Sequence, residues 1–491
     1  MPSPQKVLII GAGIAGVATA IRLAVKGYRV EVYEANGYPG GKLSQFTQDG
    51  YRFDAGPSLF TMPQYVDELF RLAGKEPSQY FRYQKLNEVC RYFYEDGTRL
   101  TAYADVDKFS AEINKQTDEA ESAVKHYLKN SSTIYNITNH VFLERSLHLL
   151  KTYLRWDTFK SILTFGKIDP FRTMHKANES FFKDARMVQF FDRYATYNGS
   201  NPYSAPATLN VIPHLEQHFG AYFPEGGMYS ITDSLVQLAE ELGVKFHYNT
   251  SVDEIVLDGR IVNSIKVNGE VNKADTIVSN MDVWFTYHRL LNKYPQLKPQ
   301  KILSQERSSS ALIFYWGIKK QFEQLDLHNI FFSANYKAEF DAIWKDKSIY
   351  HDPTVYLNIS SKYKIDDAPE GCENWFTMIN VPANTGQDWD KLIAEARQNI
   401  LIKLSRLLNE DISKLIVSES ILDPRRIESR TSSYQGSLYG TSSNNQFAAF
   451  LRHANKSSKV EGLYFCGGSV HPGGGIPLCL LSAKIVSEMI E

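Results

Sequence analysis

Three glycines near the start of the chain have the spacing of a phosphate-binding turn. Gly11, Gly13 and Gly16 follow the apolar run of residues 7–10, and Glu34 ends a second strand-like run. In such a pattern the first glycine permits a tight turn, the second lets a pyrophosphate approach the backbone, and the third lets a helix pack on the strand. The final carboxylate can accept hydrogen bonds from an adenosine ribose. The spacing predicts a dinucleotide site made by Gly11, Gly13, Ile14, Ala15, Gly16 and Glu34.

A second glycine pair, Gly40 and Gly41, is followed at once by the cation Lys42. Backbone and side chain at such a turn can wrap the far side of the same diphosphate. The binding residues predicted from this segment and the turn after it are Lys42, Leu43, Gly56, Pro57, Ser58 and Leu59.

Alternating strands and helices are needed to position these glycines. The run of residues 7–10 is apolar throughout, as expected for a strand buried on both faces. A helix is expected from about residue 14 to residue 26, with Gly27 as its C-cap, and a strand from residue 29 to residue 34. A helix at residues 230–242 and a short strand at residues 463–465 continue the pattern. The predicted fold class is α/β, with a Rossmann-like domain.

These segments resemble a large flavoprotein family that includes amine oxidases, protoporphyrinogen oxidase and carotenoid desaturases. The resemblance rests on an acid-x-x-G-x-x-G-G-[RK] pattern from Glu34 to Lys42 and on the closing stretch GLYFCGGSVHPGGGIP. With a mid-chain unit around residues 223–282 it covers roughly half of the chain. Arginine is commoner than lysine at position 42 in the family, so the charge is kept and a bidentate phosphate contact is lost.

The resemblance implies FAD as the cofactor and adds residues to its site. The backbone of Val252 would lie against the adenine, and Asn280 and Met281 would lie near the cofactor. The last helix would point its N-terminus at the pyrimidine end of the flavin ring, where the helix dipole favours negative charge on the reduced ring. Contacts implied for this stretch are Gly467, Gly468, Gly474, Gly475, Ile476 and Pro477. No metal site is predicted.

Other stretches favour the carotenoid desaturases within that family. GPSLFTMPQYVDELF, PEGGMYSITDSL, HNIFFSANYKAEFD (residues 328–341) and GSLYG are similar to phytoene desaturase-type chains, and the whole chain is most similar to bacterial hydroxycarotenoid 3,4-desaturases. The implied reaction introduces one double bond into a hydroxylated acyclic or monocyclic carotenoid. An allylic carbon beside the polyene would lose hydride to the flavin and its neighbour would lose a proton. Positioning and exclusion of water would supply most of the catalysis.

His471 and Asp54 are the titratable residues nearest to the expected flavin position. Each can accept the proton or can simply hold a loop, and the sequence leaves both roles open.

Two inserts interrupt the cofactor segments. Residues 1–105, 216–285 and 431–491 are expected to form a discontinuous FAD-binding domain of the amine oxidase/GDI-like flavoprotein fold. Residues 106–215, which are helical in pattern, and residues 286–430, which mix strands and helices, are expected to form an inserted α+β domain that binds substrate and contacts the membrane.

Basic and aromatic residues alternate in the first insert. Residues 140–176 contain seven Lys or Arg against three acids, interleaved with Trp156, Phe159, Ile162, Leu163 and Phe165. Such a stretch can rest on an anionic bilayer, or it can be a set of core helices with a solvated face. No run of about 18 apolar residues occurs, so peripheral attachment to the membrane is expected.

Composition excludes several other classes. A net charge of -1 over 491 residues gives no reason to expect a nucleic-acid partner. The four cysteines are far apart, which argues against a zinc site or a disulfide framework. Their spacing and the absence of a signal-peptide layout predict a cytoplasmic, peripherally membrane-associated protein.

Alternatives remain at this stage. Multistep phytoene desaturation is the second reading within the class, and an FAD amine oxidase is the rival enzyme. A non-enzymatic escort of prenylated proteins would have decayed cofactor segments, whereas the glycines here are intact. Oxygen and a membrane quinone are both open as the electron acceptor that reoxidises the flavin, and the oligomeric state is not readable.

Overall fold

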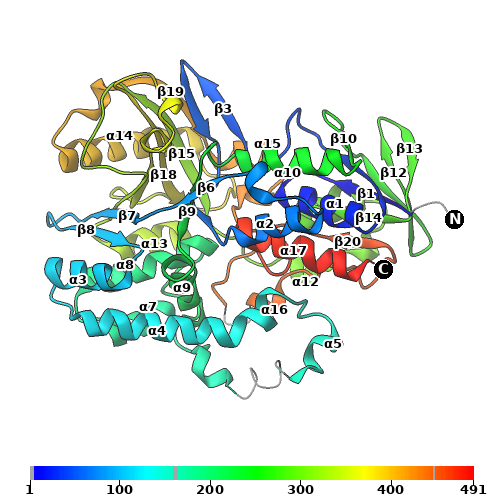
Figure 1. Ribbon diagram of the computed structural model, residues 1–491, viewed down its shortest axis with the longest axis horizontal. Coiled ribbons are helices and arrows are strands. Elements are labelled where there is room, and N and C mark those ends of the chain that lie inside the picture. The colour runs from blue at the N-terminus through cyan, green and yellow to red at the C-terminus, as the bar shows by residue number, and fades with distance from the viewer. Residues whose placement is uncertain (1–4, 157, 159–163, 446–447, 491) are drawn as a thin grey trace.

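A five-stranded parallel sheet brings the two ends of the chain together. The computed structural model describes residues 5–156, 158, 164–445 and 448–490, and Figure 1 shows this sheet beside a larger one. The strand order is β10 (Lys245–His247), β2 (Arg29–Tyr33), β1 (Lys6–Ile10), β14 (Thr276–Ser279) and β20 (Leu463–Phe465). All neighbouring pairs are parallel, so the loops after β1, β14 and β20 leave the same edge.

Both faces of this sheet are covered, as the apolar strands predicted. Val7 and Ile9 of β1 pack in a core with α1 (Ile14–Val25), α10 (Ser230–Glu241) and α17 (Ile476–Met489). Leu8 and Ile10 point to the other face, against the antiparallel sheet of β11 (Glu254–Asp258), β12 (Ile261–Val267) and β13 (Glu270–Lys273). The prediction of an α/β Rossmann-like fold is confirmed.

Element boundaries differ from the predictions by about one residue. Helix α1 ends at Val25 with Lys26 as its C-cap, and Gly27 follows with φ +89°. Gly27 is therefore the residue after the cap, where a left-handed conformation suits glycine. Strand β2 ends at Tyr33, so Glu34 starts the loop and does not end the strand.

The second sheet has seven strands, mostly antiparallel. Its order is β19 (Ile416–Leu422), β15 (Ser310–Ile318), β18 (Glu373–Val381), β17 (Val355–Asn358), β16 (His328–Phe331), β7 (Glu88–Phe93) and β8 (Arg99–Tyr103). Helix α14 (Trp389–Leu408) packs on one face through a core that includes Trp316, Trp375 and Trp389.

Helices of the first insert cover another side of this sheet. They are α3 (Val106–Gln116), α4 (Glu121–Thr138), α7 (Met174–Phe181), α8 (Ala185–Asp192) and α9 (Ile212–Gln217). Helix α5 (Leu150–Tyr153) belongs to the same insert but lies away from this sheet (Figure 1). Residues 157 and 159–163 of the basic stretch lie outside the described residues, among them Phe159, Ile162 and Leu163. Strands β7 and β8 lie in the segment assigned above to the cofactor domain, yet they pair within the seven-stranded sheet. We therefore propose that the substrate domain also includes residues 88–103.

Shorter elements join the two sheets. They are the hairpin β3 (Gln45–Gln48) and β4 (Tyr51–Asp54), the sheet of β5 (Phe60–Thr61), β9 (Ala221–Pro224) and β6 (Tyr83–Lys85), and helices α2 (Gln64–Leu72), α13 (Tyr336–Asp341) and α15 (Pro424–Thr431).

Close packing of the hairpin on the seven-stranded sheet gives a first prediction. A Cβ added to Gly317 in β15 would lie 2.5 Å from the buried ring of Tyr51. Because real Cβ atoms do not come so close, Gly317→Ala should lower the free energy of unfolding by about 1–3 kcal/mol. Gly166→Ala, where an added Cβ has no neighbour within 4 Å, should change it little. Equal melting temperatures for both variants would show that this contact is not tight.

Candidate functional site

A cavity of about 690 Å³ is lined by both sheets and by the helices of the first insert. Every predicted cofactor residue lines it except Gly16, which lies behind the first turn. The structure thus brings segments 11–15, 40–43, 56–59, 280–281 and 467–477 to one place. Their roles toward FAD remain predictions.

The first turn leaves no room for side chains. A Cβ on Gly16 would lie 2.2 Å from the carbonyl oxygen of Gly11, and one on Gly13 would lie 2.6 Å from Nδ2 of Asn280. No side chain caps α1 at Gly13, so a ligand can use the amide groups of its first turn. This geometry fits a diphosphate.

Glu34 is held in a fixed position at the rim of this turn. Its Oε2 accepts a hydrogen bond from the amide of Ala12 at 2.8 Å, and its Oε1 accepts from the amide and side-chain nitrogens of Asn36. A buried carboxylate with a set orientation suits a ribose hydroxyl.

Lys42 makes contacts that the sequence did not predict. Its Nζ donates to the carbonyl oxygens of Ser437 and Leu438 at 3.1 and 2.9 Å. Burial lowers the pKa of the ammonium to about 8, although Asp282 and Cys479 act in the opposite direction. The side chain joins the second glycine loop to segment 437–438, and a contact with a phosphate stays a prediction.

The last helix opens onto the same cavity. Gly475 precedes α17 with φ +105° and provides no side-chain cap, and Pro477 occupies the first turn. A Cβ on Gly474 would lie 2.9 Å from Tyr439. The backbone before α17 therefore faces the cavity without side chains. A flat ring that packs against this backbone would require such a bare surface.

Asp54 does not line the cavity. Arg52 forms a salt bridge to it at 2.7 Å, and the amides of Met228 and Tyr229 donate to its two oxygens at 3.0 Å. These contacts tie β4 to the start of α10 and favour the loop-holding role over proton transfer.

His471 also lies outside the lining and is 1% exposed. Its Nε2 donates to the carbonyl oxygen of Arg145 at 2.7 Å, and its backbone amide donates to His453. Burial lowers the pKa of the imidazole to about 4. The neutral ring joins the closing loop to the first insert, which again favours a structural role.

The rest of the cavity is mostly apolar. Its walls include Phe142, Ile212 and Leu215 from the insert and Ile330 and Phe376 from the seven-stranded sheet. Such a lining suits a long apolar ligand.

Sequence reasoning missed a polar group in these apolar walls. Arg193, Glu216, His328 and Tyr356 line the cavity, and of these only His328 lies in a stretch that carries the family resemblance, with no role predicted for it. Arg193 and Glu216 come from helical segments and His328 from the first position of a strand, so only the tertiary structure brings them together.

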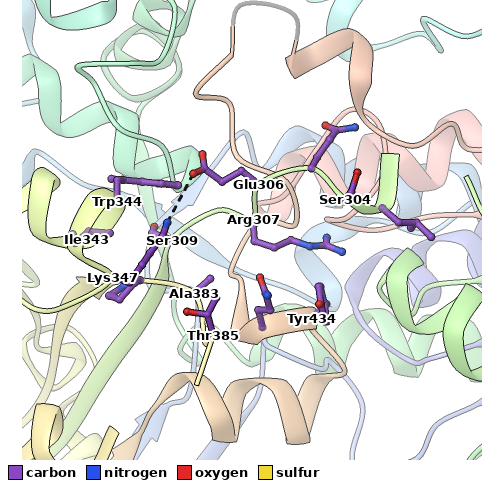
Figure 2. A pocket seen from close by; sticks show the side chains of 14 residues that line it. Ser304, Glu306, Arg307, Ser309, Ile343, Trp344, Lys347, Ala383, Thr385 and Tyr434 are labelled. Atoms are coloured by element: carbon purple, nitrogen blue, oxygen red, sulfur yellow. Dashed lines mark ion pairs between the residues drawn. The ribbon is translucent and has the colours of Figure 1, made fainter. Parts of the chain in front are cut away.

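A smaller pocket of about 270 Å³ lies beside α13 (Figure 2). Lys347 pairs with Glu306 at 3.9 Å, and Arg307 lies over the ring of Tyr434, 3.7 Å from Asp282. Asp282 also lines the main cavity. Arg307 therefore stands between the two spaces and neutralises that carboxylate.

Among the described residues, no group of three or more His, Cys, Asp or Glu is arranged to hold a metal ion. None of the helices described is both long and apolar enough to span a membrane.

Comparisons with known proteins agree with this arrangement. The family model for flavin containing amine oxidoreductase matches residues 14–490. A 1-hydroxycarotenoid 3,4-desaturase of Flavobacterium sp. (strain P99-3) is 50% identical over 99% of both chains. A 4,4'-diapolycopene oxygenase of Methylomonas sp is 35% identical over 99% of this chain and 98% of its own. Wild-type putrescine oxidase bound to putrescine shares the fold, with a TM-score of 0.62 at 14% identity over 99% of both chains.

The buried neutral His471 gives a prediction for pH. Its folded pKa of about 4 lies below its ordinary value of 6.5, so the unfolded chain takes up the proton first as the pH falls. The contribution of the neutral imidazole to the free energy of unfolding is present above pH 6.5 and is lost as the pH falls from 6.5 to 4. Lowering the pH from 7 to 5 should therefore cost about 2 kcal/mol through this residue. In urea unfolding, the free energy of unfolding of His471→Gln should fall by about 2 kcal/mol less than that of the wild type between pH 7 and pH 5. If the two proteins lose the same free energy over this range, the lowered pKa of His471 is contradicted.

Proposed function

This chain belongs to the flavin-containing amine oxidoreductase family, and we propose that within it the chain is an FAD-dependent carotenoid desaturase. Its substrate would be a hydroxylated acyclic or monocyclic carotenoid, desaturated at the 3,4 position. The observation that carries the proposal is the 50% identity, over 99% of both chains, to a 1-hydroxycarotenoid 3,4-desaturase. The proposal is also supported by the single cavity that both the glycine loops and the apolar walls line.

The cofactor is FAD, and the glycine loops of the cavity fit it. A bound flavin supplies the two-electron acceptor for the reaction. We assign the diphosphate to the turn at Gly11 and Gly13, the ribose to Glu34, and the ring to the bare backbone before α17. The positive end of that helix would favour negative charge on the ring.

The substrate requires little acid–base chemistry from the protein. Loss of hydride from a carbon beside a polyene is eased because the positive charge spreads along the conjugated chain. A proton then leaves the adjacent carbon, and a new double bond forms. The apolar walls would hold the polyene in place and keep out water. This agrees with the structural contacts of Asp54 and His471, which need not react.

Exposed apolar residues in the basic stretch of residues 140–176 support attachment to a membrane surface. Leu154, Trp156 and Phe171 are 85%, 69% and 78% exposed. Arg155, Lys167 and Arg172 are close to them in the sequence. Apolar side chains that can enter the acyl boundary, flanked by cations, suit an anionic bilayer. A carotenoid dissolved in lipid would reach the cavity from there.

The function can be tested with purified protein loaded with FAD on liposomes that carry a hydroxylated carotenoid, without air. The flavin absorption should bleach, the polyene band should shift to the red, and the product should be two mass units lighter. Liposomes without protein are the control. Bleaching with phytoene alone would move the assignment to multistep desaturation. If neither carotenoid bleaches the flavin and an amine supplied in air releases peroxide, an amine oxidase would replace the proposal.

Membrane attachment has its own test. Leu154→Asp with Phe171→Asp should reduce cosedimentation with anionic vesicles by about tenfold or more, because two large apolar groups no longer enter the lipid. Ile365 and Val271 are also exposed, at 82% and 56%, but lie elsewhere in the chain. The matched double variant Ile365→Asp with Val271→Asp should bind like wild type. Equal binding by all three proteins would exclude this surface.

A further inference from the structure

A polar group interrupts the apolar wall of the main cavity. The cavity lining includes Arg193, Tyr197, Glu216, His328 and Tyr356. Of these, Arg193, Glu216 and His328 are buried. A polyene has no polar atom along its length that could use such groups. The inference below rests on the proposed function and concerns what these residues recognise.

Arg193 and Glu216 are occupied by the protein itself. Arg193 donates to the hydroxyls of Tyr92 and Tyr197, each at 2.7 Å. Glu216 accepts from Tyr194 and Tyr197, each at 2.6 Å, and lies 3.6 Å from Arg193. The pair is thus compensated by neighbouring tyrosines, as a buried pair must be.

His328 has one ring nitrogen without a partner among the described residues, as Arg193 has at Nε. His328 is 3% exposed, and its Nε2 makes no hydrogen bond among the described residues. Its Nδ1 lies 2.7 Å from Oη of Tyr356 and 3.2 Å from Nδ2 of Asn358. Burial and the charge of Arg193 lower the pKa of the imidazole to about 3, so the ring is neutral and carries one hydrogen.

The neighbours of the ring decide which nitrogen carries that hydrogen. Nδ2 of Asn358 also donates to the carbonyl oxygen of Leu327 at 3.0 Å, which fixes the orientation of the amide. An amide nitrogen can only donate, so Nδ1 of His328 accepts and Nε2 carries the hydrogen. A buried donor without a partner is unfavourable unless a ligand supplies an acceptor.

We infer that Nε2–H of His328 donates a hydrogen bond to the hydroxyl oxygen of the carotenoid substrate and so determines which end of the polyene enters and where it stops. The position of His328 would let it set how far the polyene enters the cavity. Tyr356, the partner of Nδ1, lies 2.8 Å from Oγ of Ser58 in the predicted cofactor segment. The hydroxyl anchor is thereby held at a fixed distance from the cofactor loop, which would select one bond near the hydroxylated end.

The first test uses wild-type protein and changes the substrate alone, so folding of a variant is not an issue. Two carotenoids with the same polyene, one with the terminal hydroxyl and one without it, are compared on liposomes, without air for flavin bleaching and with an added quinone, which reoxidises the flavin, for KM. The KM should be about 10- to 100-fold lower for the hydroxylated carotenoid. Flavin bleaching by both carotenoids with equal KM would overturn the hydroxyl anchor and leave the proposed function intact. Bleaching by neither would overturn the proposed function itself.

The second test assigns the preference to His328. His328→Leu removes the donor and should bring the two KM values within about threefold of each other by raising only that of the hydroxylated carotenoid. His328→Gln, which offers an amide donor, should restore part of the preference. The matched control is His453→Gln, since His453 is also buried, has a pKa lowered to about 4, and does not line the cavity. It should keep the full preference. An unchanged preference in His328→Leu would show that another group binds the hydroxyl.

Discussion

The cofactor side of the cavity depends on the close approach of separate backbone segments around Asn280. Added Cβ atoms at Gly13, Gly16 and Gly467 would lie 2.6, 3.1 and 2.6 Å from its side chain. The amide of Asn280 donates to Ile10, and its Nδ2 donates to Gly11. Only glycine permits this approach, because any side chain would enter the space of the amide. The start, the middle and the end of the chain are thereby joined at the edge of one sheet.

This constraint shapes the rest of the molecule. The strands of the second insert, together with β7 and β8, form the second sheet over the same cavity, and helices of the first insert line another part of it. Contacts between distant segments hold the two parts together. Arg52 pairs with both Asp54 and Asp367, and Lys42 reaches the carbonyls of Ser437 and Leu438. Groups that look catalytic in the sequence therefore act as ties between segments.

The two halves of the cavity use opposite physical properties. The cofactor half presents backbone amides and a carboxylate, which suit a charged dinucleotide. The substrate half is apolar, so a polar group in its wall is costly unless it is paired within the protein or by a ligand. Both oxygens of Glu216 and two nitrogens of Arg193 are paired with tyrosines, whereas Nε of Arg193 and Nε2 of His328 have no partner among the described residues. These unpaired donors are the groups in the wall that a polar end of a substrate could use.

Local sequence was enough to predict the cofactor unit. Spacing of Gly11, Gly13 and Gly16, the buried strand before them and the acid at Glu34 act over short distances, so they indicated the α/β fold and the dinucleotide turn. The family resemblance added residues 252, 280–281 and 467–477, which line the same cavity. The roles favoured for Asp54 and His471 and the place of β7 and β8 in the second sheet depended on partners more than 90 residues away. The polar group at His328 likewise depended on Arg193, which a distant segment brings to the same cavity wall. No local pattern records such contacts, because burial and hydrogen bonding between distant segments are decided only when the chain packs.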